Sequence, residues 1–306
     1  MAKPTPTRVI PFSIDAIEEA ARLVLAGEPV AVPTETVYGL AADATNARAV
    51  ARIYEAKGRP SFNPLIVHVT DLATAEAIGQ FNDAARRLAA DHWPGPLTLV
   101  VPLKNNAPIA SLVTAGLSTI ALRVPAHPAM QALLNAVRRP LAAPSANASG
   151  RISPTRAEHV LASLEGRISL IIDGGATARG IESTIVAATG GPVRLLRRGP
   201  IEVDAVESSG NLEAPGMLAS HYAPSKPVRL DAMEARAGEY LIGFGPVAGQ
   251  ATLSASGDTV EAAARLFDLL HEADAATELG IAVAPIPGDG LAAAIRDRLQ
   301  RAAAPR

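Results

Sequence analysis

Cysteine is absent from the 306 residues, and several kinds of chemistry are excluded with it. Without a thiol the chain forms no disulfide, offers no thiolate to a metal and has no cysteine nucleophile. Six histidines are scattered with no HExxH-like cluster, which disfavours a structural zinc site. Aromatic residues make up only 3% of the chain while hydrophobic residues reach 48%, so we expect an aliphatic, alanine-rich core.

Long apolar runs and a strong charge of either sign are absent too. No run approaches the roughly 18 residues that cross a bilayer, and residues 1–8 lack a signal-peptide core, so the default expectation is a cytoplasmic protein without membrane contact. Residues 1–208 carry 20 Lys and Arg against 18 Asp and Glu, and residues 209–306 carry 8 against 12. Neither part is a polycation, so charge predicts at most weak binding of tRNA.

Short apolar runs alternate with helical periodicity along the chain, which indicates the α/β class. Strands are expected at residues 30–32, 65–69, 97–101, 119–125, 141–143 and 170–173, in a hairpin over 183–197, and at 240–244 and 280–285. Helices are expected at residues 14–26, 47–56, 72–78, 83–90, 128–137, 155–164, 259–273 and 290–303.

Residues 208–227 are rich in Ser, Gly and Pro and have the composition of a linker. They separate a large part, residues 1–207, from residues 228–306. The second part is near the minimum size for an independent core, and we expect it to carry no chemistry of its own.

The densest polar pattern lies in residues 33–69. Pro33 stops a buried strand and is followed by a turn containing hydroxyl residues and Gly39, while Lys57 and Arg59 stand at a helix exit framed by Gly58 and Pro60. Taken alone, the two cations would be expected to complement the helix dipole. Their rigid frame beside so many hydrogen-bonding side chains favours an anion site instead.

Together these motifs resemble the two-domain threonylcarbamoyl-AMP synthases of the YrdC-like family. The resemblance covers nearly the whole chain and rests on Pro33 to Val69, Thr119 to Pro125, Ala143-Pro144-Ser145-Ala146-Asn147, Glu182-Ser183-Thr184-Ile185-Val186, Leu196-Arg197, Pro215-Gly216-Met217 and His221-Tyr222-Ala223-Pro224. It implies a YrdC-like twisted mixed sheet with flanking helices in residues 1–207. It also implies a linker or lid at 208–227 and a smaller Rossmann-like α/β domain at 228–306.

The resemblance implies a nucleotidyltransferase that makes L-threonylcarbamoyl-AMP from L-threonine, bicarbonate or CO2, and ATP with Mg2+, releasing pyrophosphate. Separate transferase proteins would then modify the tRNA adenosine next to the anticodon. By the same resemblance, Lys57 and Arg59 are catalytic. No residue of the sequence is assigned as a metal ligand, and the ligands of the Mg2+ stay open. The implied L-threonine site consists of Thr36, His68, Arg123, Ala143 and Ser183. The implied ATP site consists of Arg59, Asn63, Thr119, Ser145, Asn147, Ser153, Arg197 and Tyr222.

Two other functions fit parts of the pattern. One is a non-catalytic RNA-binding module with a basic concave face, which the near-neutral charge disfavours. The other is carbamoyl transfer from carbamoyl phosphate, as in YrdC-like domains of larger maturation enzymes. The chain has no acylphosphatase-like or zinc-finger segment to accompany that activity.

Overall fold

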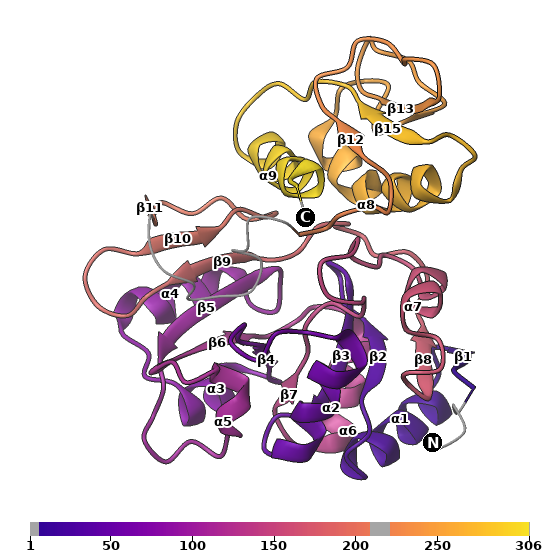
Figure 1. Cartoon of the computed structure of the whole chain (residues 1–306). Coiled ribbons are helices and arrows are strands. Elements are labelled where there is room, and N and C mark those ends of the chain that lie inside the picture. The colour runs from indigo at the N-terminus through magenta and orange to yellow at the C-terminus, as the bar shows by residue number, and fades with distance from the viewer. Residues whose placement is uncertain (1–5, 209–220, 306) are drawn as a thin grey trace.

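The computed structural model describes residues 6–208 and 221–305, which form two sheets with flanking helices (Figure 1). The larger, mixed sheet has eleven strands in the order β1-β8-β2-β3-β7-β4-β6-β5-β9-β10-β11. The smaller sheet has four parallel strands in the order β12-β15-β13-β14. The predicted fold class is confirmed. Among the described helices, none is long and apolar enough to cross a membrane.

The strands of the larger sheet are β1 (Arg8–Pro11), β2 (Val30–Pro33), β3 (Tyr38–Asp43), β4 (Ile66–His68), β5 (Leu97–Pro102), β6 (Thr119–Arg123), β7 (Leu141–Ala142), β8 (Leu170–Asp173), β9 (Thr184–Ala187), β10 (Arg194–Arg197) and β11 (Val206–Glu207). Its helices are α1 (Ile14–Leu25), α2 (Ala47–Lys57), α3 (Leu72–Ile78), α4 (Asp83–His92), α5 (Ser111–Thr114), α6 (Pro128–Val137) and α7 (Ala157–Leu164). The C-terminal unit contains β12 (Val228–Arg229), β13 (Glu239–Gly243), β14 (Ala251–Thr252), α8 (Thr259–Ala275), β15 (Gly280–Val283) and α9 (Leu291–Ala303).

Local signals account for the helix bounds near the site. Ser13 caps α1 by accepting a hydrogen bond from the Ala16 amide, and Asn46 caps α2 in the same way. Helix α2 ends at Gly58, whose φ of 59° is in the left-handed region that glycine adopts without steric cost. The predicted helix exit at Lys57 is therefore confirmed.

One expectation near Pro33 was wrong. The turn there ends at Val37, and Tyr38–Asp43 forms strand β3, antiparallel to β2, instead of continuing the turn through Gly39. Every residue of β3 is buried, so the strand lacks the polar alternation that marks a half-exposed strand. The short strands β1, β11, β12 and β14 and the single-turn helix α5 were not predicted either.

Apolar side chains cover both faces of the larger sheet. Helices α1 and α6 pack on β2 and β8 through one buried cluster, and helices α2 to α5 and α7 contribute to a second. The C-terminal unit lies beside β9, β10 and α7, with α8 and α9 turned toward the larger unit (Figure 1). Its own core cluster includes Val37, Ile152 and Ile181 of the larger unit. Most of the predicted linker, including Pro215-Gly216-Met217, lies outside the described residues.

Candidate active site

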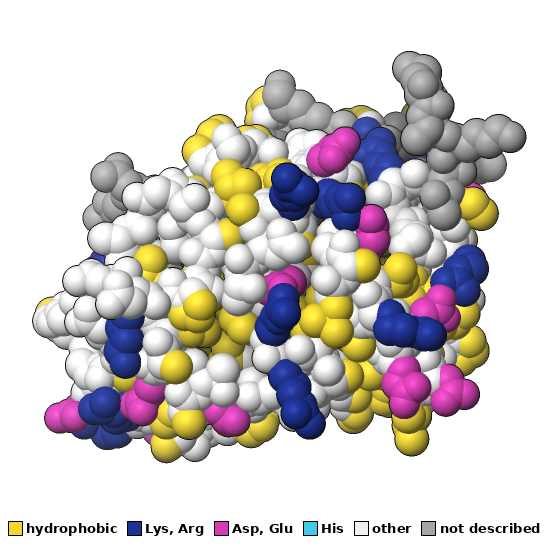
Figure 2. All heavy atoms as spheres, turned by 90° about the horizontal axis from the view of Figure 1, so that it is seen from below, with side chains coloured by type: hydrophobic (Ala, Val, Ile, Leu, Met, Phe, Trp, Pro, Cys, Tyr) yellow, Lys and Arg dark blue, Asp and Glu magenta, His cyan; other side chains and the backbone are white. Residues whose placement is uncertain are grey.

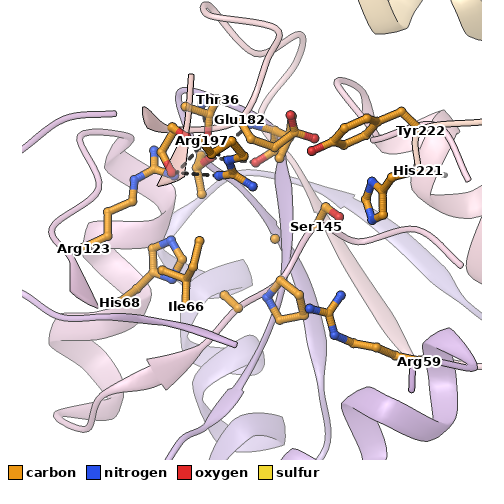
Figure 3. A pocket seen from close by; sticks show the side chains of 16 residues that line it. Thr36, Arg59, Ile66, His68, Arg123, Ser145, Glu182, Arg197, His221 and Tyr222 are labelled. Carbon is orange, nitrogen blue, oxygen red and sulfur yellow. Dashed lines mark hydrogen bonds between the residues drawn. The ribbon is translucent and has the colours of Figure 1, made fainter. Parts of the chain in front are cut away.

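A cavity of about 50 Å³ lies where several strands of the larger sheet end. Strands β4 and β6 are parallel neighbours with His68 level with Arg123, so both side chains reach the same end of the sheet. The cavity is lined by Thr34, Thr36, Val37, Gly39, Arg59, Ile66, His68, Arg123, Ala143, Pro144, Ser145, Glu182, Ser183, Arg197, His221 and Tyr222 (Figure 3). Most of the residues predicted for threonine and ATP are therefore brought together.

Thr34 shapes the turn between β2 and β3. Its hydroxyl accepts hydrogen bonds from the amides of Thr36 and Val37, each at 3.2 Å, and donates to the Val37 carbonyl at 2.6 Å. A hydroxyl that bonds its own backbone in this way stabilises a tight turn. The turn places the Thr36 hydroxyl against Arg123. Thr34 lines the cavity. It was one of the hydroxyl residues in the predicted anion site, although neither substrate was assigned to it.

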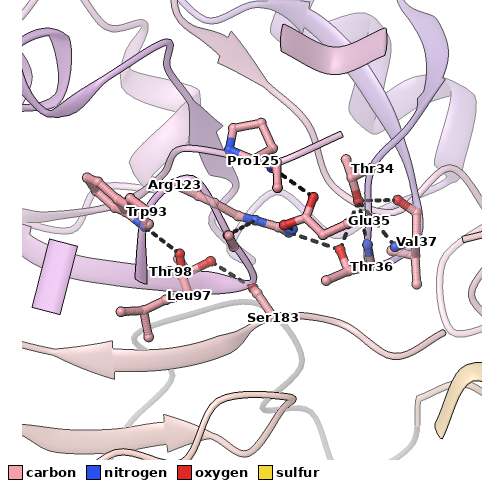
Figure 4. Close-up of polar contacts among 12 residues, drawn as sticks. Thr34, Glu35, Thr36, Val37, Trp93, Leu97, Thr98, Arg123, Pro125 and Ser183 are labelled. Carbon is pink, nitrogen blue, oxygen red and sulfur yellow. Dashed lines mark hydrogen bonds and ion pairs between the residues drawn. The ribbon is translucent and has the colours of Figure 1, made fainter. Parts of the chain in front are cut away.

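Arg123 is held on three sides (Figure 4). It donates to Glu35 Oε1 at 2.6 Å, to Thr36 Oγ1 at 3.0 Å and to the Gly95 carbonyl at 3.2 Å. Burial raises the pKa of Glu35, but the charge and hydrogen bond of Arg123 outweigh it, and the net pKa is lowered. Glu35 is thus an ionised partner that the sequence reasoning missed, although it stands inside the Thr-Glu-Thr motif.

Ser183 forms hydrogen bonds to one residue of strand β5 and one residue of strand β10. Its hydroxyl lies 2.7 Å from the Thr98 hydroxyl, and Arg197 donates to both its hydroxyl and its carbonyl at 3.1 Å (Figure 4 shows the Thr98 contact). Burial lowers the pKa of Arg197. A predicted threonine residue and a predicted ATP residue are therefore in direct contact.

Glu182 is a second carboxylate that the sequence reasoning left out of the site. Its Oε1 accepts a short hydrogen bond from Ser153, and its Oε2 accepts one from Arg298 Nε at 3.2 Å. Ser153 does not line the cavity itself, but this bond links it to Glu182, which does. The only sequence signal was the position of Glu182 at the start of the Glu-Ser-Thr motif.

Several buried polar atoms of the cavity wall have no hydrogen-bond partner. They are both ring nitrogens of His68, Nδ1 of His221 and the hydroxyl of Tyr222. Burial, followed by the charge of Arg123, lowers the pKa of His68 to about 3. Burial, followed by Arg59 and Lys57, lowers the pKa of His221 to about 3 as well. Buried polar groups are nearly always paired in folded proteins, so these neutral groups are available to bind a ligand that enters the cavity.

Lys57 lies behind the cavity rather than in it. Its ammonium donates to the carbonyls of Ser145, at 2.6 Å, and Asn147, and burial lowers its pKa well below the usual value. In this conformation it ties α2 to the loop after β7. Asn147 itself bonds the carbonyls of Ala148 and Arg151.

Two further predicted ATP residues stand apart from the cavity lining. Asn63 is fully buried with neither amide atom paired, next to the Arg59 guanidinium, which donates to the Asn63 carbonyl at 3.3 Å. Thr119 begins β6, at the opposite end of that strand from Arg123.

Comparisons with known proteins cover nearly the whole chain. A family model described as "Telomere recombination" matches residues 22–199, and one described as "Threonylcarbamoyl-AMP synthase, C-terminal domain" matches residues 177–304. The threonylcarbamoyl-AMP synthase of Bacillus subtilis is 41% identical over 95% of this chain and 93% of its own. The Pyrococcus abyssi protein of the same name is 39% identical over 94% of this chain and 93% of its own.

Solved structures agree with these matches. The crystal structure of Pyrococcus abyssi Sua5 complexed with L-threonine superposes with a TM-score of 0.87 at 36% identity, covering 98% of this chain and 97% of that one. Escherichia coli YciO, at 22% identity and a TM-score of 0.55, shares the fold over 65% of this chain. The chain therefore belongs to the Sua5/YrdC family, in the two-domain form whose relatives are named threonylcarbamoyl-AMP synthases.

Proposed function

We propose that the cavity makes L-threonylcarbamoyl-AMP from L-threonine, bicarbonate or CO2, and ATP, with release of pyrophosphate. Within a chain of this family, the supporting observation is the set of unpaired buried polar atoms on His68, His221 and Tyr222. They face a cavity that also contains the guanidinium groups of Arg59 and Arg197. Neutral donors beside cations suit ligands that combine phosphate or carboxylate with hydroxyl groups.

We place L-threonine at the Arg123 side of the cavity. Its carboxylate would bind Arg123 together with the Thr36 hydroxyl, and Ser183 and the neutral His68 would bind the rest of the amino acid. Ala143 would limit the space beside the side chain. The crystal structure of the Pyrococcus abyssi relative with L-threonine supports a threonine site in this fold.

ATP would occupy the side lined by Arg59, Ser145 and Tyr222, with Arg197 between the two substrates. Asn63, Thr119, Asn147 and Ser153 remain proposed ATP residues. Lys57 can reach a phosphate only after its ammonium leaves the Ser145 and Asn147 carbonyls. We infer that phosphate binding competes with these two bonds, so the loop after β7 responds to the nucleotide.

The step that joins the two substrates brings together two anions, the threonine carbamate and ATP. The threonine amine adds to CO2 and loses a proton to give a carbamate, a carbamate oxygen attacks the α-phosphorus of ATP, and pyrophosphate leaves. Arg59 and Arg197 lower the repulsion as charge accumulates, and the threonine contacts hold the carbamate oxygen in line. Catalysis is therefore mainly electrostatic and positional.

Mg2+ would enter as part of the ATP substrate. In residues 6–208 and 221–305, no three His, Asp or Glu side chains are grouped to hold a metal ion. Glu182, which lines the cavity, is already bound by Arg298, and Glu35, which pairs with the cavity residue Arg123, is bound by that arginine. The phosphates of ATP would thus supply the anionic ligands of the ion.

The cavity must open to admit these substrates. Its free space of about 50 Å³ holds only a few water molecules. Tyr222 is buried with a φ of 61°, a left-handed conformation that costs energy for a bulky residue. We propose that His221 and Tyr222 swing away for entry and close over bound ATP.

The chain would work in the cytoplasm and pass its product to separate tRNA-modifying transferases. We propose residues 1–207 as the catalytic domain, 208–227 as the linker or lid and 228–306 as the accessory domain. RNA binding as the main function has little support on the surface shown in Figure 2, where basic side chains are scattered and several lie beside acidic ones.

The deciding experiment measures pyrophosphate release from ATP and Mg2+, with L-threonine and bicarbonate added separately and together. The proposal expects release only when both are present. Release without either, or none with both, would contradict it. Salt-sensitive binding of structured RNA without turnover would then favour the RNA-binding alternative, and turnover of carbamoyl phosphate would favour carbamoyl transfer.

A further inference from the structure

Helix α9 of the C-terminal unit extends one buried cation to the wall of the cavity. Arg298 has an exposed fraction of 0% and donates from Nε to Glu182 at 3.2 Å and from Nη1 to Asp297 at 3.0 Å. Its guanidinium carbon lies 5.6 Å from the centre of the Tyr222 ring. Glu182 and Tyr222 both line the cavity, although Arg298 does not.

The Glu182 carboxylate stands beside a substrate-binding cation. Figure 3 shows it between Arg197 and Tyr222. Burial lowers the pKa of Arg197 and the charge of Arg298 lowers it further, while Tyr222 and the negative charge of the Glu182 carboxylate raise it. In the structure, its two oxygens are turned to Ser153 and Arg298 instead. Ser153 and Arg298 thus each bind one oxygen of the Glu182 carboxylate, and Arg298 is the cation of the two.

The segment that carries Glu182 is also clamped by helix α8. Ile181 is fully buried in the core cluster of the C-terminal unit. A Cβ at Gly180 would lie 2.3 Å from the carbonyl oxygen of Ala263 and 2.4 Å from Ala264, so the backbones are in close contact there. Two helices of the C-terminal unit thus hold the residues immediately before Ser183.

We propose that Arg298 is a positioning residue that keeps the Glu182 carboxylate from competing with substrate anions for Arg197. The proposal rests on the proposed function, because it assigns Arg197 to a substrate. Without Arg298, a buried carboxylate would lose its cation and turn to the nearest remaining one. The C-terminal unit would in this way set the affinity of the cavity for ATP while touching no substrate.

The test compares Arg298→Met with Arg296→Met, the same change two residues earlier on α9. Arg296 donates to the Ile286 carbonyl and does not line the cavity, so it controls for loss of an arginine from this helix. We expect Arg298→Met to weaken ATP binding by at least about tenfold, as loss of a charge-assisted contact would. Arg296→Met should bind ATP like the wild type.

Two more variants separate positioning from general damage. Adding Glu182→Gln to Arg298→Met removes the competing charge, and we expect it to recover most of the lost ATP affinity. Arg298→Lys retains the cation and should stay within about threefold of wild type if charge is what matters. Additive loss in the double variant, or wild-type ATP affinity in Arg298→Met, would overturn the proposal.

Equilibrium ATP binding is measured by calorimetry alongside pyrophosphate release, and circular dichroism checks folding. If Arg298→Met fails to fold, the ATP affinities of Arg298→Lys and of the double variant Glu182→Gln/Arg298→Met decide the question. A wild-type protein that binds ATP but releases no pyrophosphate with threonine and bicarbonate would refute the proposed function. The binding comparison would still show whether Arg298 acts through Glu182.

Discussion

Glu35 and Arg123 form an ion pair of 2.6 Å across 88 residues of sequence, with only 12% and 4% of their side chains exposed. Glu35 Oε2 also accepts a bond from the Ala126 amide at 3.1 Å, so the carboxylate is fixed from two sides. The guanidinium is thereby oriented before any substrate arrives. A threonine carboxylate would have to share Arg123 with Glu35, so the affinity for L-threonine should depend on this ion pair.

The first prediction concerns Arg123. Arg123→Met should weaken the binding of L-threonine at least about tenfold, because it removes a charged contact. The effect on ATP binding should be smaller. Arg123→Lys should not restore affinity, because an ammonium cannot contact Glu35, Thr36 and a carboxylate in one plane. Threonine titrations of pyrophosphate release give the measurement. Arg52→Met, at an exposed pair with Glu28, is the control and should behave like the wild type.

The two cations at the C-terminal end of α2, Lys57 and Arg59, should be essential for turnover. We expect Lys57→Ala and Arg59→Ala each to reduce the rate at least about a hundredfold. Arg59→Ala removes a cation from the cavity wall, and Lys57→Ala removes both the bonds to the loop after β7 and the ammonium that would turn to the phosphates. Circular dichroism should show a folded protein in both cases. Near-normal turnover, or unfolding of both variants, would count against their assignment.

Tyr222 offers a test that separates binding from stability. Its hydroxyl is buried without a partner, so Tyr222→Phe removes an unsatisfied group and should leave the unfolding free energy unchanged or slightly higher. If the hydroxyl binds the nucleotide, the same change should weaken ATP binding several-fold. Urea unfolding and ATP calorimetry on one preparation measure both. A destabilised variant with normal ATP affinity would contradict the role of the hydroxyl in ATP binding.

Acid should destabilise the fold through its buried histidines. Burial, followed by its stacked neighbour His271, lowers the pKa of His159 to about 3. The unfolded chain therefore binds more protons between that pKa and the free value of about 6.5. The contribution of neutral His159 to the unfolding free energy is fully present above about pH 6.5. It is lost as the pH falls toward 3, by up to about 1.4 kcal/mol per pH unit.

The matching variant is His159→Gln. Its unfolding free energy should fall less steeply than that of the wild type between about pH 6.5 and about pH 4.5. Urea unfolding at several pH values gives the two slopes. Equal slopes would show that His159 is not among the groups responsible.

Much of the local structure was predictable because its causes are local. Ser13 and Asn46 cap their helices through neighbouring amides, and Gly58 ends α2 by its own backbone freedom. Strand β3 was missed because a strand buried on both faces has no polar alternation to reveal it. The family pattern likewise indicated most of the cavity lining, since the motif residues sit at strand ends.

By itself, the sequence determined the fold class, the family and the chemical types in the cavity, because these follow from local patterns and ordered motifs. Only the tertiary structure decided which charges meet. The strand order brings Glu35 to Arg123, and the docking of α9 brings Arg298 to Glu182, 116 residues away. Such pairs depend on how sheets and helices pack, and a strand or helix carries no local signal for a partner so distant along the chain.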